Sequence, residues 1–406
     1  MLPQRQPRHI VKFFEPSQDP AEGLGVLMLF RLIEESVPAF FSSARPILIT
    51  RAPGRLAVIG GRWPGRGSLR LQMPIAEGAC VAVQQSDDDL VRLWSPCRDG
   101  SRTQLLSMRL ADLGLPDAPI DYQEARALLL SDPRDRWAGY LLGALLVLAR
   151  ERGLRPTRGS DLLLYSDVPD SRGVAASTAI TLAAMRAFAL QHGVELAPGE
   201  LVELVDIVER EVFRVGDRRA DAMALLHAEA GELLVWRDGA DDLGRLVVPS
   251  DLEFVALETG PPPAGLLASV AAQLTSPSTD DSTAARFASL LGAEPTAANR
   301  RELGDLLFAA HADYAGTGEF GTPADVVVAA ARARRDAGGA LLGAKATGPL
   351  GTTVVLLGPH TKVWHEALRL KKALHTATGH SAHVFRWSSP GALAFGSIEL
   401  RPRAAP

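Results

Sequence analysis

A run of small residues joins an apolar segment to a long helical pattern in the first half of the chain. Residues 161–165 are largely apolar and end in a proline-bearing turn, and a helical pattern opens at about residue 175. Between them, Gly173 and its small neighbours would let backbone N–H groups approach phosphate oxygens, where the helix dipole adds positive potential. The pattern indicates a phosphate-binding loop, although a tight strand-to-helix connection without a ligand would look the same.

Two further glycine-containing segments accompany this loop, one before it and one after it. Residues 51–61 read RAPGRLAVIGG, and residues 343–353 read GAKATGPLGTT. Taken in order, the three segments resemble the three motifs of the GHMP small-molecule kinases, and most of all those of the L-arabinokinase and galactokinase branch. The resemblance runs over about residues 47–358. It implies a two-lobed α+β fold whose first lobe is like a small-subunit ribosomal protein and whose second lobe is ferredoxin-like.

The resemblance assigns nucleotide binding to the loop, to the third segment beneath it and to one tryptophan. These residues are Gly173, Val174, Ala175, Ala176, Ser177, Thr347, Gly348 and Trp137. ATP and Mg²⁺ are the implied cofactors. The family has a serine where this chain has Ala176, so Ser177 or an additional water would have to contact the metal. The alternative for Trp137 is a place in the core, since an aromatic residue at helical spacing more often packs than binds a cofactor.

A carboxylate for the magnesium ion is expected in the acidic helical segment at residues 205–215. The segment carries Glu209 and Glu211, and family members have a glutamate five residues before the glycine that corresponds to Gly216. This register predicts that Glu211 binds the metal together with Ser177. The alternative is that the acidic residues form a solvated helix face.

The catalytic base of the family is an aspartate at a helix start, paired with the arginine of the first segment. Asp221 and Arg55 match these two residues, provided that two residues are missing between Gly216 and Asp221. An adjacent guanidinium would keep the carboxylate ionised and help to orient an acceptor hydroxyl. The alternatives are an ordinary N-cap aspartate and a structural salt bridge.

The segment after the first motif departs from the sugar-binding pattern. Galactokinases and arabinokinases have an Asp-Tyr pair there, whereas this chain has Pro64 and Gly65. Arg62 and Arg66 add positive charge and fork-shaped donors that suit a carboxylate or a phosphate. The hypothesis is an anionic acceptor held by these arginines, and the alternative is that both lie in a solvent-exposed loop.

The resemblance implies an ATP-dependent kinase that phosphorylates a hydroxyl of a sugar or sugar-like metabolite. A second interpretation remains open because Pro64, Ala176 and Pro349 alter the sugar-binding and phosphate-binding segments. This is a catalytically impaired homologue that binds a nucleotide or metabolite or acts as a partner protein.

The composition is that of a globular protein, with 47% apolar and 22% charged residues among 406. A net charge of −4 without a basic stripe gives no reason to expect nucleic acid. Cys80 and Cys97 suggest no disulfide framework, so a reducing cytoplasm is expected. We find neither the apolar core of a signal peptide nor a run of about 20 apolar residues, so no membrane segment is expected.

Short strands and helices must position these segments. Helices are expected at residues 24–41, 137–150, 175–191 and 198–215, and strands at 47–50, 56–59, 231–236 and 252–257. Residues 79–84 and 90–94 are expected to pair as a hairpin around an acidic turn. The irregular alternation predicts an α+β fold with an N-terminal extension (1–45), a first lobe (46–235) and a second lobe (236–406).

Overall fold

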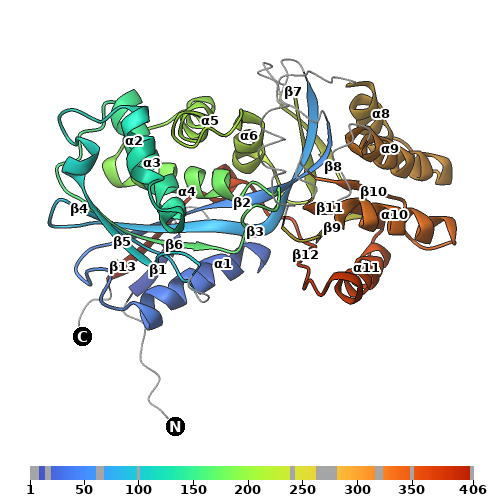
Figure 1. Ribbon diagram of the computed structural model, residues 1–406, viewed down its shortest axis with the longest axis horizontal. Helices are drawn as coiled ribbons and strands as arrows, with labels where there is room; N and C mark the ends of the chain where they lie inside the picture. The colour runs from blue at the N-terminus through green and yellow to red at the C-terminus, as the bar shows by residue number, and fades with distance from the viewer. Residues whose placement is uncertain are drawn as a thin grey trace, which may run out of the picture.

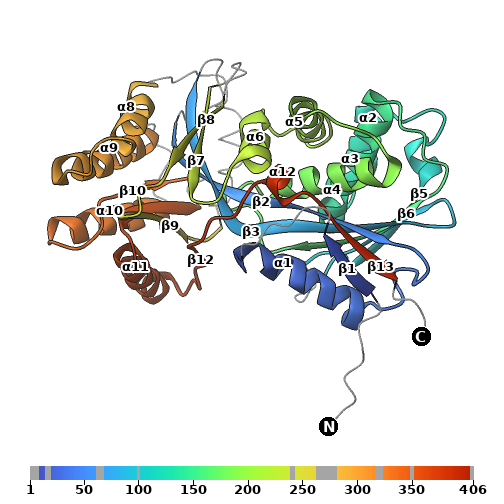
Figure 2. The ribbon, with the colours of Figure 1, turned by 180° about the vertical axis from the view of Figure 1, so that it is seen from behind.

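The computed structural model shows two lobes of sheet and helix that lie side by side (Figures 1 and 2). It describes residues 9–13, 20–60, 68–97, 101–237, 243–261, 281–315, 323–347 and 352–402. Each lobe has one sheet with helices packed on it, which confirms the α+β class. None of the helices within these ranges is long and apolar enough to cross a membrane.

The larger sheet contains nine strands within the described residues. They are β1 (His9–Phe13), β2 (Ile47–Gly60), β3 (Leu69–Gln85), β4 (Leu90–Trp94), β5 (Leu105–Arg109), β6 (Ser160–Ser166), β7 (Glu232–Arg237), β8 (Leu243–Val247) and β13 (Ile398–Pro402). Their order is β1-β13-β2-β3-β6-β4-β5, and β7 and β8 extend the sheet from the first half of β3. All pairs are antiparallel except β4 with β6.

Helices cover both faces of this sheet (Figure 1). On one face lie α2 (Tyr122–Leu129), α3 (Arg136–Glu151), α4 (Ala176–His192), α5 (Pro198–Ile207) and α6 (Arg219–His227), and on the other lies α1 (Pro20–Arg31). Single turns occur at Leu32–Ser36, Leu110–Leu113, Pro133–Asp135, Val208–Val212 and α12 (Ala392–Phe395). Helix α3 is buried from Trp137 to Ala149 and α4 is almost as apolar, so these two helices form the centre of the core.

The second lobe has a smaller antiparallel sheet in the order β10-β11-β9-β12. Its strands are β9 (Leu252–Glu258), β10 (Gly343–Ala346), β11 (Thr353–Pro359) and β12 (Val384–Phe385). The helices of this lobe are α8 (Asp281–Leu291), α9 (Ala297–Ala315), α10 (Pro323–Asp336) and α11 (Lys362–Thr378). Residues of β9, β10, β11, α10 and α11 form a separate apolar core here.

The expected break between strands 47–50 and 56–59 is absent, because β2 runs through both. The register of β2 against β3 shifts between Pro53 and Arg55, and again between Ala57 and Ile59. A β-bulge accommodates a proline that cannot donate to the ladder, so the strand continues past it.

The predicted hairpin of residues 79–84 and 90–94 is wrong. Strand β6 lies between β3 and β4 and pairs with both. The acidic turn instead joins the residue before β6, since Ser86 N–H donates to the Gly159 carbonyl and Gly159 N–H donates to that of Asp88. A local turn pattern predicts a reversal of the chain but not which strand inserts into the sheet.

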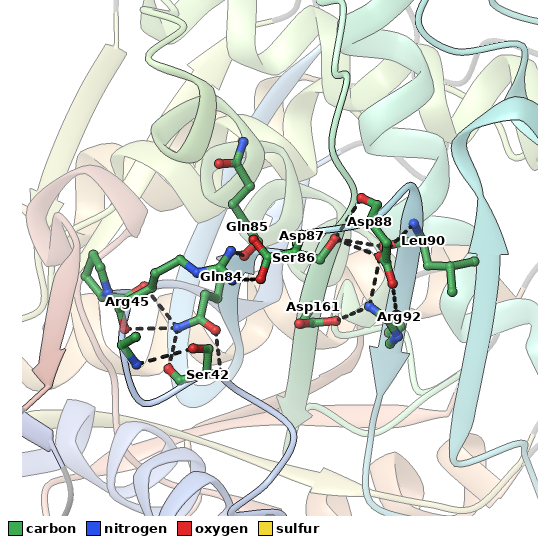
Figure 3. A network of polar contacts seen from close by, with 12 residues as sticks. Ser42, Arg45, Gln84, Gln85, Ser86, Asp87, Asp88, Leu90, Arg92 and Asp161 are labelled. Carbon is green, nitrogen blue, oxygen red and sulfur yellow. Dashed lines mark hydrogen bonds and ion pairs between the residues drawn. The ribbon is translucent and has the colours of Figure 1, made fainter.

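A polar network ties this turn to the segment before β2 (Figure 3). The Gln84 amide donates to the Ser42 and Arg45 carbonyls, both at 3.0 Å. Arg92 in β4 donates to Asp88 and to Asp161 of β6. Nearby arginines therefore balance the charge of the acidic turn, and its aspartates are not part of the candidate site.

The lobe boundary predicted near residue 235 does not match the sheets. Leu69 pairs with Arg237, so β7 and β8 belong to the first sheet rather than to the second lobe. At the other end of the chain, β13 returns to pair with β2. The second lobe is thus inserted between strands of the first, a long-range arrangement that local pattern does not reveal.

Gly54 allows β2 to approach the loop that precedes α4. A Cβ there would lie 2.8 Å from Ile75 Cδ1 and 2.9 Å from the Val174 carbonyl oxygen. We predict that Gly54→Ala lowers the free energy of unfolding by about 1–3 kcal/mol through overpacking. The matched control is Gly199→Ala in α5, where a Cβ meets nothing within 4 Å. Urea denaturation of both variants checks this, and equal effects would contradict the close approach.

Candidate active site

The loop before α4 has the backbone shape of an anion-binding turn. Gly173 and Ala175 have φ of 70° and 64°, in the left-handed region. Ala175 is the N-cap of α4 and provides no side-chain cap, so no side chain occupies the first N–H groups of the helix. The left-handed backbone conformation costs a non-glycine residue such as Ala175 about 1–2 kcal/mol. The packing around the loop must therefore stabilise this conformation.

Arg55 joins the first segment to this loop and to α6. Its Nε and Nη2 donate to Asp221 Oδ1 at 2.9 and 2.7 Å, and its Nη1 donates to the Gly173 carbonyl. The backbone N–H of Arg55 also donates to the Val174 carbonyl at 3.0 Å. The predicted pair of Arg55 and Asp221 therefore forms in the structure, and it touches the predicted phosphate loop.

Asp221 lies in the first turn of α6 and is 4% exposed. Besides Arg55, it accepts hydrogen bonds from Gln72 Nε2 at 3.2 Å and from Arg218 Nη1 at 3.3 Å. Burial would raise the pKa of Asp221, but the charges of Arg55 and Arg218 outweigh burial, so the pKa lies below its ordinary value. The carboxylate is therefore ionised at neutral pH, as a base must be.

The structure places Glu211, the predicted metal ligand, away from the loop before α4. Residues 208–212 form a π-helical turn after α5. Glu211 points outward, 34% exposed, and pairs with Arg210, whereas Glu209 is fully buried. Thr178 Oγ1 donates to Glu209 Oε1 at 3.2 Å. Glu209, not Glu211, therefore faces the start of α4.

The surroundings of Glu209 fit a magnesium ion. Burial raises its pKa above the ordinary value, although the charge of Arg218 and hydrogen bonds from Ser177 and Thr178 oppose that shift. Its Oε2 is buried and has no hydrogen-bond partner. Among the described residues no cluster of three or more acidic, His or Cys ligands occurs. One carboxylate and one hydroxyl beside a phosphate loop suit Mg²⁺, which commonly keeps waters and uses phosphate oxygens.

Thr347 of the third segment lies directly against the loop. Thr347 is fully buried, its carbonyl lies 3.0 Å from where a Cβ on Gly173 would be, and its Oγ1 accepts from the Ala57 N–H at 2.8 Å. A side chain at position 173 would collide with this backbone. Gly348, Arg62 and Arg66 lie outside the described residues.

The structure places Trp137 in the core of the first lobe. It is 5% exposed, its Nε1 donates to the Thr103 carbonyl at 2.9 Å, and the Arg102 guanidinium lies 5.6 Å from its ring centre. This placement fits the packing alternative better than contact with an adenine. The remaining loop residues, Val174 and Ala176, are buried, and Ser177 is half-buried.

Sequence reasoning missed three side chains of this cluster. Glu209 lies in the segment expected to supply the metal ligand, but counting five residues back from Gly216 selects Glu211 instead. Gln72 carried a usable signal, since it stands in residues 71–77 (LQMPIAE), shortly after the first segment. In the structure it pairs with Ala57 across β2 and β3. For Arg218, the sequence offers no signal other than its position three residues before Asp221.

Comparison with known proteins agrees with this architecture. Residues 139–229 match the model of the GHMP kinases N terminal domain. The L-arabinokinase of Arabidopsis thaliana is 33% identical over 243 residues, which are 54% of this chain and 23% of that protein. A galactokinase of Chloroflexus aggregans is 27% identical over 217 residues, which are 53% of this chain and 50% of the relative.

Solved structures show the same fold at low sequence identity. Lactococcus lactis galactokinase, complexed with galactose, superposes with a TM-score of 0.70 at 18% identity, covering 90% of this chain and 99% of that one. Methanococcus jannaschii mevalonate kinase superposes with a TM-score of 0.61 at 16% identity. The superposition covers 84% of this chain and 98% of that one.

The architecture is therefore the two-lobed fold of small-molecule kinases. The match over residues 139–229 and the arabinokinase and galactokinase relatives support the GHMP kinase superfamily, on the side of the arabinokinase and galactokinase branch. The chain spans 23% of the plant arabinokinase and 50% of the galactokinase that it matches.

We predict that Glu209→Gln raises the Mg²⁺ concentration needed for nucleotide binding by about 10- to 100-fold, the effect expected for losing a metal-site partner. Because burial raises the pKa of Glu209, Mg²⁺ must displace a proton at low pH. The Mg²⁺ requirement of the unmodified protein should then rise as pH falls, and that of the variant should not. Glu211→Gln is the matched control. Calorimetric titration at several pH values checks this, and equal behaviour of both variants would exclude Glu209 as a ligand.

Proposed function

We propose that this protein is an ATP- and Mg²⁺-dependent kinase that transfers a phosphoryl group to a hydroxyl of a sugar or sugar-like metabolite. The observation that supports it most is the buried pair of Arg55 and Asp221, held against the loop before α4. Its relatives in sequence are sugar kinases, which supports the same reaction class here.

Each group of the site has a role that its geometry suits. The backbone of residues 173–177 would hold the phosphates, and Glu209 with Ser177 would hold the metal, which screens phosphate charge when bound. Asp221 would accept the proton of the acceptor hydroxyl as that oxygen bonds to the γ-phosphorus and the bond to the β–γ bridging oxygen breaks. Arg55 and Gln72 would fix the orientation of Asp221.

The described residues of the site give no support to the alternative of a catalytically impaired homologue. The alanine at position 176 removes one hydroxyl, but Ser177 and Thr178 lie beside the buried carboxylate of Glu209. The catalytic pair is complete and the base is kept ionised. These features are what phosphoryl transfer requires.

Asp221→Asn should lower kcat by about two to four orders of magnitude, since it removes the proton acceptor with little change in volume. Affinity for MgATP should change little, because the loop, Glu209 and Ser177 remain. The neighbouring Asp217→Asn is the control, since Asp217 pairs with Arg219 outside the catalytic pair. ADP release and MgATP binding check this, and full turnover in Asp221→Asn would exclude it as the base.

The acceptor is proposed to be anionic, a uronic acid or a phosphorylated sugar, because Arg62 and Arg66 stand near the altered sugar-binding segment in sequence. Charge-assisted contacts of this kind contribute about 1.5–3 kcal/mol, or about 10- to 100-fold in affinity. Kinetics on matched neutral and acidic sugars, with Arg62→Ala and Arg66→Ala, check this. Equal efficiency on neutral sugars, unchanged by either variant, would contradict it.

A further inference from the structure

The guanidinium of Arg218 contacts Asp221, and its charge acts on both acidic residues of the site. Its Nη1 lies 3.3 Å from Asp221 Oδ2, on the opposite carboxylate oxygen from the one that Arg55 contacts. Its positive charge also acts on Glu209, which touches the start of α4 through Thr178. Arg218 thus contacts the proposed base and acts electrostatically on the proposed metal ligand.

Arg218 and Glu209 each have one buried polar atom without a hydrogen-bond partner. Arg218 Nε is buried and donates to no acceptor, and Glu209 Oε2 is buried and accepts from no donor. A buried donor or acceptor without a partner is costly, which points to a group that the site is built to receive. A phosphoryl group with its metal ion would supply both missing partners, an oxyanion for Arg218 and a cation for Glu209.

The backbone of Arg218 is held in place independently of any ligand. Its N–H donates to Asp206 Oδ1 at 2.7 Å, and Asp206 is itself fully buried. The side chain keeps 35% of its surface exposed, so a ligand can reach it. Arg55, by contrast, has Nε and Nη2 committed to Asp221 and Nη1 to the Gly173 carbonyl.

We propose that Arg218 binds the terminal phosphoryl group of the nucleoside triphosphate and offsets the charge that develops there during transfer. This inference rests on the kinase function proposed above. The guanidinium suits the task because its planar fork can bind phosphate oxygens in a bidentate manner and stays charged. The other source of an oxyanion at this point is an acidic group on the acceptor, and the two sources predict different results.

The test compares binding of MgATP and MgADP in the absence of acceptor, for the unmodified protein, Arg218→Gln, Arg218→Lys and the control Arg219→Gln. Arg219 adjoins Arg218 but pairs with Asp217 and Glu203. We expect Arg218→Gln to weaken MgATP about 10- to 100-fold and to leave MgADP within about twofold. Arg218→Lys should recover part of the loss, and Arg219→Gln should show none.

Two results would overturn the proposal while the kinase function stands. One is that MgATP and MgADP weaken equally, or not at all, in Arg218→Gln. The other is that only the KM for an acidic acceptor rises, which would assign Arg218 to the acceptor. Thermal unfolding of each variant excludes misfolding as the cause. If the unmodified protein bound neither nucleotide, the kinase function would itself be wrong.

Discussion

The buried ion pair of Arg55 and Asp221 is the interaction on which the candidate site depends. Through Arg55 it connects β2, the loop before α4 and the first turn of α6, three segments far apart in the chain. Breaking a buried pair by removing one partner commonly costs about 3–5 kcal/mol. Such a pair orients groups well only when its surroundings hold both partners, and here Gln72 and Arg218 complete the shell around Asp221. The same contacts that position the carboxylate also keep it ionised.

The burial of Glu209 is the second constraint, because this residue, and not Glu211, faces the loop. Glu209 follows the buried Val205 by four residues on the same helix face, whereas Glu211 is part-exposed beside Arg210. Burial of a carboxylate oxygen is unfavourable unless a bound cation or a hydrogen-bond donor contacts it. A bound metal ion would give this carboxylate oxygen a partner.

Sequence reasoning found the segments of the site but not all of its contacts. The three ordered segments led to the fold, to the pair of Arg55 and Asp221 and to Thr347 under Gly173, since each depends on local residue types. A count back from Gly216 selects Glu211, because such a count assumes the family's spacing to the glycine and does not show which carboxylate is buried. The sequence did not predict that β6 lies between β3 and β4, or that β13 pairs with β2. Strand order of this kind is set by long-range packing.

The central claim is that the loop before α4, Glu209 and Asp221 form one phosphoryl-transfer centre. A crystal structure with Mg²⁺ and a non-hydrolysable ATP analogue tests it most directly. The account predicts a metal ion about 2.0–2.1 Å from a Glu209 carboxylate oxygen, with the phosphates on the N–H groups of residues 173–177 and the γ-phosphate beside Asp221. A nucleotide bound elsewhere, or a metal ion held by Glu211 with Glu209 still unpaired, would contradict it.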